Sequence, residues 1–332
     1  MIFHGPILGL LLGSLLVSFM LVYSAFYAVQ ILLRWDMRSG SEIQLGLERR
    51  TYLISVLITY ALGFQLLSLF LFIYTADHLA PLFVGAMCAA GSLNVNPWGY
   101  PTIVLKIVNF ILGAVWLVIN FTDNRAWGYP LIRKKYALLL CIAPLILAET
   151  IFQTAYSAGL HPNIITSCCG TLFTADAAGV TSGIIALPPI PLAVTFYTLM
   201  GATLICGVYY RRAGKGVTLF SILSSLTFLA SGVALISFIP LYFYELPTHH
   251  CPFCLLHKEY LYVGYALYLA FLGGVISGLG VGILKPFSGV ESLKGVVPGI
   301  QRRLALASLV SNGISLLIVV YGVLSSNLIL LD

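Results

Sequence analysis

The chemically reactive side chains of this sequence are most concentrated in residues 248–259, which read THHCPFCLLHKE. This segment contains a Cys-x-x-Cys pair, and histidines flank the pair on both sides. Two cysteines at this spacing can bring both sulfurs to one metal ion, and mixed thiolate and imidazole ligands suit copper or zinc. We therefore predict metal ligands at His249, His250, Cys251, Cys254 and His257.

A second cysteine motif is the adjacent pair Cys168 and Cys169. Neighbouring cysteines rarely bond to each other, because the small ring strains the peptide between them. They can instead offer two thiolates to one soft metal, so both join the predicted ligands. In the alternative interpretation, one of them forms a disulfide with Cys88 and the other has no role.

Redox chemistry is the second hypothesis for the same side chains. Cys251 and Cys254 would then be catalytic and would exchange disulfides, relayed by Cys168 or Cys169 or, from the remaining outer loop, by Cys88. A disulfide that only fastens an exposed loop is the third interpretation, and it requires no more than an oxidising compartment.

The composition places these motifs in a membrane protein. Of the 332 residues, 60% are hydrophobic and only 8% are charged, whereas a soluble domain has about a quarter charged residues. A membrane-spanning helix needs about 20 apolar residues. Eight runs are long enough, and they predict an all-α polytopic bundle that forms a single membrane domain over residues 1–332. The predicted spans are 7–33, 52–75, 102–121, 137–158, 191–210, 217–242, 260–284 and 304–330.

Lysine and arginine indicate the orientation of these spans. Fifteen of the 17 basic residues lie in four short segments between spans, namely 34–50, 125–135, 211–215 and 285–303. Positive charge is retained on the cytoplasmic side, so these segments are predicted to be cytoplasmic and both termini extracytoplasmic. The net charge of +6 is then explained by the basic residues that hold these segments on the cytoplasmic side. Nucleic acid is therefore not expected as a partner.

The predicted extracytoplasmic loops, 76–101, 159–190 and 244–259, carry most of the reactive side chains. All six histidines and five of the seven cysteines lie on this side of the predicted topology. We therefore expect a Cys/His site on the outer face of the cell (inner) membrane. Cys141 and Cys206 fall within spans, where cysteine behaves as a small hydrophobe, and receive no role.

Three further sequence features predict local structure in or next to the spans. The apolar stretch 79–90 is too short to cross a bilayer and is expected to form an interfacial or re-entrant helix. The seventh span should begin close behind Cys254, which would place His257 on the same helix face and let the helix dipole lower the pKa of a cysteine in its first turn. Glycines at positions 274, 278 and 282 should allow a neighbouring helix to approach closely.

Two ionisable residues, Lys106 and Glu149, lie inside predicted spans. Such groups are costly in lipid unless they are paired, and they are candidates for function. We expect them to pair, with Asn109 and Gln153 one helical turn away, and to serve a proton route or contact a quinone headgroup. The alternative is a Lys106 side chain that extends to the membrane surface.

The stretch Cys251-Pro252-Phe253-Cys254, followed by Lys258-Glu259, resembles the quinone-linked membrane disulfide oxidoreductases of the DsbB and vitamin K epoxide reductase types. The resemblance covers about a dozen residues. Those proteins have a compact four-helix core with about half the spans predicted here. The resemblance therefore implies only that Cys251 and Cys254 are a redox pair, and neither the fold nor quinone binding is carried over from it. Quinone is the cofactor expected under the redox hypothesis.

The leading functional hypothesis is metal handling or the assembly of an extracytoplasmic metalloprotein. Besides the lipid bilayer, it implies a metal-carrier protein as partner. The second hypothesis is a thiol–disulfide oxidoreductase that serves a thioredoxin-like protein and passes electrons to a membrane carrier. The third is a structural subunit of a larger membrane complex, whose outer disulfides only hold loops.

Overall fold

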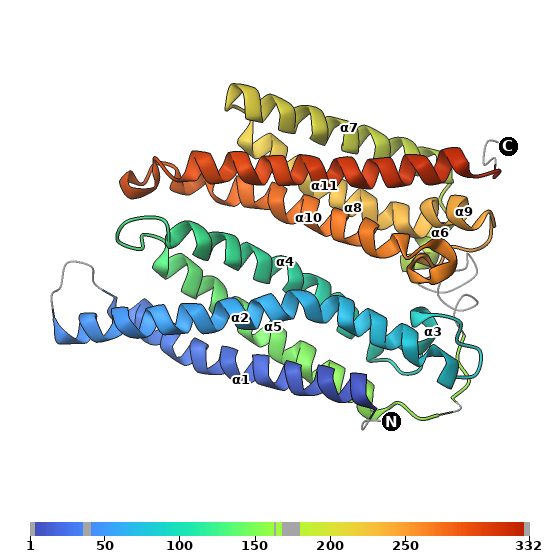
Figure 1. Cartoon of the computed structure of the whole chain (residues 1–332), viewed down its shortest axis with the longest axis horizontal. Helices are drawn as coiled ribbons and strands as arrows, with labels where there is room; N and C mark the ends of the chain where they lie inside the picture. Colours follow the sequence, from blue (N-terminus) through green and yellow to red (C-terminus); the bar gives the residue numbers. More distant parts are fainter. Residues whose placement is uncertain (1–3, 36–40, 163, 168–179, 329–332) are drawn as a thin grey trace. The chain divides into compact units, whose positions relative to one another are not determined.

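A computed structural model of the chain describes residues 4–35, 41–162, 164–167 and 180–328. Within these residues the fold is helical apart from one isolated parallel bridge between Val84 and Ile165. Eight helices are long and apolar enough to cross a membrane (Figure 1), so the predicted all-α polytopic bundle is confirmed. They are α1 (Gly5–Arg34), α2 (Glu42–Leu79), α4 (Gly99–Asp123), α5 (Ile132–Ala158), α7 (Pro189–Ala213), α8 (Val217–Ser237), α10 (Val263–Ile283) and α11 (Val297–Ser325).

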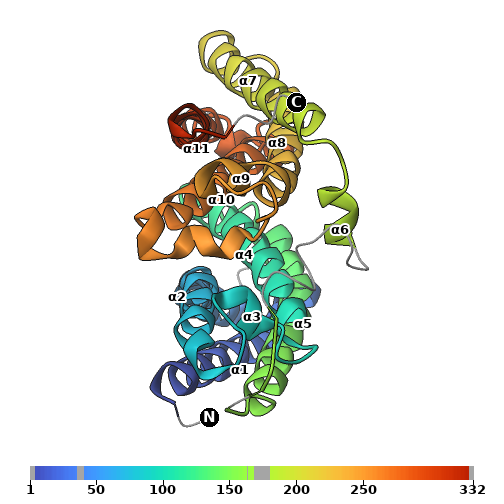
Figure 2. The ribbon, with the colours of Figure 1, turned by 90° about the vertical axis from the view of Figure 1, so that its right-hand side faces the viewer.

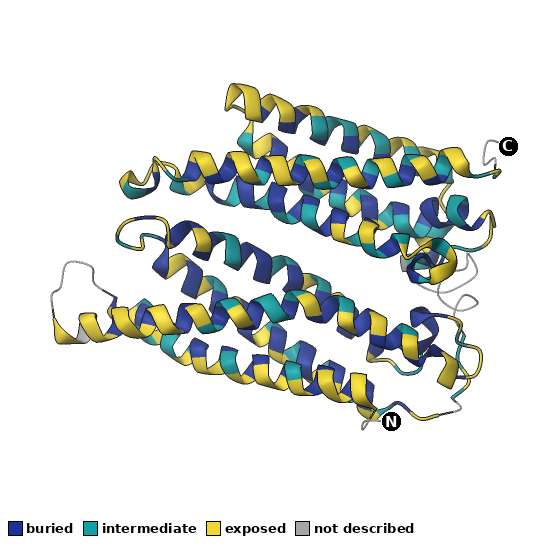
Figure 3. Cartoon of the chain, in the orientation of Figure 1, coloured by how far each residue is buried: buried dark blue, intermediate teal, exposed yellow. Residues whose placement is uncertain are grey.

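The side chains that these helices expose are those of a protein in lipid. Large apolar residues such as Phe19, Leu33 and Tyr321 are among the most exposed. Figure 3 shows buried and exposed residues alternating along α7 and α11. Serine, threonine and amide side chains are instead buried between helices, and Ser18 of α1, for example, is hydrogen-bonded to Thr150 of α5. This arrangement, with apolar side chains outside and polar side chains between helices, is expected in a bilayer. Apolar surface is stable in contact with lipid, whereas a polar group exposed to lipid costs free energy unless it is hydrogen-bonded.

The chain divides into two compact units. Unit 1 comprises Met1–Leu82, Leu93–Ile164 and Gly289–Val296. Its helices α1, α2, α4 and α5 form a bundle in which each helix packs against two of the others (Figures 1 and 2). The apolar core of this bundle includes Leu62, Trp116, Leu139 and Ile142.

Unit 2 comprises Phe83–Ser92, Ile165–Ser288 and Val297–Asp332. It contains a second four-helix arrangement of α7, α8, α10 and α11. The close helix approach predicted at the glycines is confirmed: a Cβ atom at Gly278 would collide with Ser224 of α8, and one at Gly274 with Asn312 of α11. Small residues thus set the spacing of α10 from two neighbours.

The expectation of one interfacial helix over residues 79–90 is wrong. Helix α2 continues to Leu79, a single 3-10 turn η1 follows over Ala80–Leu82, and a short helix α3 begins only at Ala89 (Ala89–Leu93). Gly85 lies between them at φ +87°, a left-handed conformation that ends any helix there. The loop so formed pairs with a second loop, because the Thr166 amide donates to the Val84 carbonyl at 2.9 Å.

Candidate metal and thiol site

Three cysteine sulfurs converge in unit 2. The Sγ atoms of Cys88, Cys251 and Cys254 all lie within 4.8 Å of one another, and Cys88 Sγ lies 3.6 Å from Cys251 Sγ. Sulfurs that share a tetrahedral zinc ion with bonds of about 2.3 Å stand about 3.8 Å apart. Cys88 and Cys251 are fully buried and Cys254 is half-buried. The three thiols therefore form a cluster that could bind a metal ion.

Cys88 reaches the cluster because it immediately precedes helix α3. Its carbonyl accepts hydrogen bonds from the amides of Gly91, at 3.0 Å, and Ser92, at 3.4 Å. The Thr166 hydroxyl also donates to the Gly91 carbonyl at 3.0 Å, which fixes the start of α3 against the second loop. Cys88 is thereby held at the start of α3, which the Thr166 hydroxyl fastens to the second loop.

The Cys-x-x-Cys pair is positioned by a 3-10 helix, η2 (Pro252–Leu256), for which Cys251 is the N-terminal flanking residue. A 3-10 helix has three residues per turn, so side chains three apart lie on one side. This is why Cys251 and Cys254 face the same point. Two tyrosine hydroxyls hold the backbone where the turn begins: Tyr244 donates to the Cys251 carbonyl at 2.8 Å, and Tyr268 donates to the Pro252 carbonyl.

The seventh span begins later than predicted. A further 3-10 turn, η3 (Lys258–Tyr260), is followed by Leu261 and Tyr262 at φ +53° and +56°, and α10 starts only at Val263. Left-handed residues interrupt helical hydrogen bonding, so the 3-10 turns cannot merge with α10. The expectations that the span's dipole acts on the cysteines, and that His257 shares an α-helical face with Cys254, are both wrong.

The three histidines of this segment have different surroundings. His249 Nε2 lies 3.4 Å from Cys254 Sγ, and its ring packs edge-on against Tyr244. His250 Nδ1 faces the carbonyls at the end of α8, 3.1 Å from that of Ile236. His257 Nδ1 lies 4.0 Å from a carboxylate oxygen of Glu259. His249 thus contacts one sulfur of the cluster, whereas the group of ligand atoms within 4.8 Å of one another consists of the three sulfurs alone.

The remaining cysteines are either outside the described residues or away from the cluster. Cys168 and Cys169 lie outside the part of the chain that the structure describes, so their roles stay predictions. Cys141 lies in α5 and Cys206 in α7, within candidate spans, as predicted.

The tyrosines near the cluster act as neutral hydrogen-bond donors. Burial raises the pKa of Tyr244, and the nearby cysteines raise this pKa further. Burial also raises the pKa of Tyr260, whose ring packs against Tyr244 with centroids 4.7 Å apart. Since a raised tyrosine pKa favours the protonated phenol, Tyr244 keeps its hydrogen bond to Cys251 throughout the physiological pH range.

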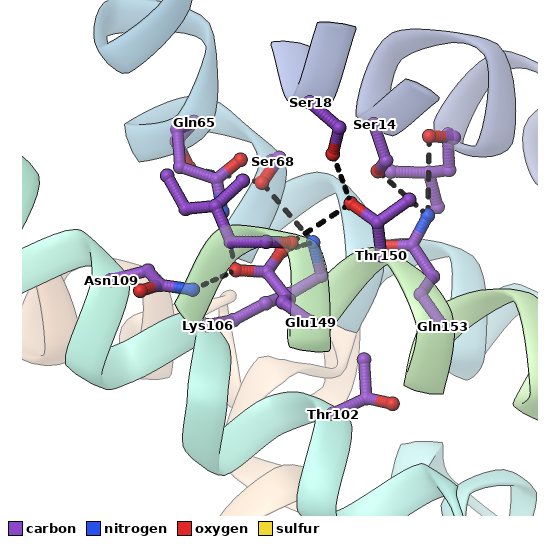
Figure 4. A network of polar contacts seen from close by, with 12 residues as sticks. Ser14, Ser18, Gln65, Ser68, Thr102, Lys106, Asn109, Glu149, Thr150 and Gln153 are labelled. Carbon is purple, nitrogen blue, oxygen red and sulfur yellow. Dashed lines mark hydrogen bonds and ion pairs between the residues drawn. The ribbon is translucent and has the colours of Figure 1, made fainter. Parts of the chain in front are cut away.

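A second polar cluster lies in unit 1 (Figure 4). The ion pair expected between Lys106 and Glu149 is present, with Nζ to Oε1 at 2.7 Å, and both side chains are buried. The alternative in which Lys106 extends to the membrane surface is therefore wrong. The other carboxylate oxygen accepts from Gln65 Nε2 at 2.5 Å and Asn109 Nδ2 at 2.6 Å. Helices α2, α4 and α5 are thus joined through one carboxylate.

Sequence reasoning missed two features of these sites. It considered Cys88 only as a disulfide partner or relay, since Cys88 lies 163 residues before Cys251 and no local motif surrounds it. A second buried ion pair joins Lys135 Nζ to Asp123 Oδ2 at 2.8 Å. Lys135 belongs to a basic segment predicted to be cytoplasmic, and only its spacing from an acidic residue at the end of the preceding span could have suggested a pair.

No protein-family model, curated protein or solved structure matches this chain. The local resemblance to membrane thiol oxidoreductases thus stays a prediction.

Proposed function

We propose that this protein binds a soft or borderline transition metal, copper or zinc, through Cys88, Cys251 and Cys254, with His249 as fourth ligand. It would lie in the cell (inner) membrane with this site on the extracytoplasmic face, and serve metal handling or metalloprotein assembly. The observation that carries the proposal is the convergence of three sulfurs from two distant segments within 4.8 Å.

A bound metal ion would engage all three sulfurs of the cluster, whereas a disulfide would engage only two. A disulfide joins two sulfurs at about 2.05 Å and leaves the third without a bond. A metal ion takes all three thiolates and the adjacent imidazole, which is a common zinc ligand set. Without the imidazole, three thiolates suit monovalent copper, the softer ion. The proposal does not depend on His250 or His257.

The test is metal content. Protein purified in detergent under anaerobic conditions should contain about one zinc or copper ion per chain, measured by elemental mass spectrometry. The variant Cys251→Ser should lose this metal, whereas Cys141→Ser, which removes a thiol exposed in a candidate span, should retain it. Metal-free wild-type protein that also fails to take up either ion would contradict the proposal.

A thiol–disulfide oxidoreductase is the second candidate, and one observation favours it. The 3.6 Å separation of Cys88 and Cys251 would let a disulfide between Cys251 and Cys254 pass to Cys88 by thiolate attack. Oxidation of two thiols to a disulfide releases two electrons and two protons, which a quinone would accept. A disulfide that is reduced by a thioredoxin-like protein and re-forms only with added quinone would favour this function. A structural subunit would show neither metal nor reactive thiols.

A further inference from the structure

The polar cluster of unit 1 has features that the proposed metal site does not explain. Glu149 is surrounded by three helices and receives three donors, one of them the Lys106 ammonium (Figure 4). In this state the carboxylate is ionised and the pair is neutral overall. A buried pair of this kind inside a membrane bundle suggests function as well as structure.

Two amide oxygens in this cluster have no hydrogen-bond partner among the described residues. They are Asn109 Oδ1 and Gln153 Oε1, and both side chains are almost completely buried. Their amide nitrogens are engaged, since Asn109 donates to Glu149 and Gln153 donates to Ser14 Oγ at 2.9 Å. A buried acceptor without a donor is costly. Both oxygens therefore require a donor, either water or an acidic O–H group.

One end of unit 1 offers water a short path to the pair. Gln153, one turn from Glu149, lines a cavity of about 10 Å³ at the end of the bundle where α2 and α5 finish. This volume is enough for about one water molecule. In the opposite direction the next buried residues, including Leu62, Trp116 and Ile146, belong to the apolar core, and the buried pair of Lys135 and Asp123 lies beyond them. The topology predicts that the end with the cavity is extracytoplasmic.

We propose that Glu149 is a proton-binding site that exchanges protons with this end of unit 1 through water held at Gln153. On uptake, an excess proton from the aqueous phase passes to that water as the water hands one of its own protons to Glu149 Oε2, so the water is left unchanged. The Asn109 amide then turns over, so that its otherwise unpartnered Oδ1 accepts the new O–H group.

Lys106 has other partners for its charge in the protonated state. Its Nζ lies 3.2 Å from Ser68 Oγ and 5.3 Å from the centre of the Phe72 ring, so a hydroxyl and an aromatic face remain when Glu149 becomes neutral. The net charge of the cluster rises from zero to +1. Lys106 therefore keeps a hydroxyl and an aromatic partner in both protonation states of Glu149.

The groups that face Glu149 come from α2, α4 and α5, and α1 adds Ser14 and Ser18 through its contacts with α5. The charged side chain in contact with Glu149, within the part of the chain that the structure describes, is Lys106. Tyr156 of α5 lies seven residues after Glu149 and packs against Phe72 with ring centroids 5.6 Å apart. A phenol is neutral at neutral pH, so Glu149 and Lys106 govern the titration.

Infrared difference spectroscopy on the detergent-purified full chain tests this inference. Acidification should produce the carbonyl band of a protonated carboxylic acid, and Glu149→Gln should abolish it. The matched control is Asp123→Asn, which alters the other buried ion pair of unit 1 and should leave the band unchanged. Gln153→Leu should slow the deuteration of the same carboxyl group, because it removes the amide that holds the water.

Three results would overturn the inference: no carboxylic acid band between about pH 5 and pH 9, a band that persists in Glu149→Gln, or deuteration unaffected by Gln153→Leu. In a further variant, Lys106→Met, the carboxyl group should be protonated at every pH tested, since its counter-ion is gone. None of these measurements depends on metal or on the cysteines, so this inference and the proposed function can fail separately.

Discussion

At the scale of single residues, the site depends on which side chains touch which sulfur. Cys251 and Cys254 belong to a recognisable motif, but the third thiol and the contacting imidazole are defined only by geometry. A metal site that lacks one of three thiolates loses a bond to the ion, whereas the loss of a neighbouring group is milder. Substitutions at these positions therefore have a predicted order of severity.

The first prediction concerns Cys88. We expect Cys88→Ser to reduce metal affinity by more than roughly 100-fold, as a lost ligand should exceed the effect of an outer-shell partner. Competition with a chelating dye measures the affinity, and Cys141→Ser is the control. If Cys88→Ser bound metal as tightly as wild type, Cys88 would not be a ligand and the three-sulfur site would be wrong.

The second prediction separates two histidines of one segment. His249→Ala should also weaken metal binding by more than roughly 100-fold, because it removes the proposed fourth ligand, whose imidazole contacts the Cys254 sulfur. His257→Ala should have little effect, since its Nδ1 faces Glu259 at 4.0 Å. The same dye competition measures both. Equal losses in the two variants would show that the whole segment, and not His249, supports the site.

At the scale of helices, close packing between α8 and α10 depends on glycine. Gly278→Ala should destabilise the protein by about 1–3 kcal/mol, because the added methyl group collides with Ser224. Gly232→Ala in α8 is the matched control, since no neighbouring atom of the described residues lies within 4 Å of the position that its methyl group would take. It should be neutral or slightly stabilising. Thermal unfolding in detergent measures both. Equal melting temperatures of the two variants would show that packing between α8 and α10 does not require glycine at position 278.

The helices themselves were predictable because a membrane imposes a simple rule of length and polarity. All eight predicted runs correspond to helices in the structure, and the glycine spacing correctly indicated close packing on α10. Helix ends were harder. Leucine and tyrosine rarely adopt a left-handed backbone conformation, so the sequence does not predict it at Leu261 and Tyr262. The predicted start of α10 is therefore too early. Contacts between distant segments, such as that of Cys88 with Cys251, leave no pattern in the sequence around either residue, so they could not be predicted.

At the scale of the whole molecule, orientation still follows from lysine and arginine alone. The prediction can be tested with two very exposed loop residues, Leu261 and Trp127, which are 88% and 89% exposed. In intact cells a membrane-impermeant thiol reagent should label Leu261→Cys, but should label Trp127→Cys only after permeabilisation. Both variants would carry Cys168→Ser and Cys169→Ser, because these two cysteines are predicted to lie on the extracytoplasmic side and would otherwise react in intact cells. The reverse pattern would place the thiol cluster on the cytoplasmic side and contradict an extracytoplasmic site.

The distance along the chain between Cys88 and Cys251 also has a consequence for biosynthesis. A ribosome makes Cys88 163 residues before Cys251. Two of the elements that position the second thiol, η2 and α10, come later still. The pocket for the ion therefore cannot exist on the nascent chain. If the metal proposal holds, Cys88 must stay reduced while the rest of the protein is translated and inserted, and the ion must arrive last.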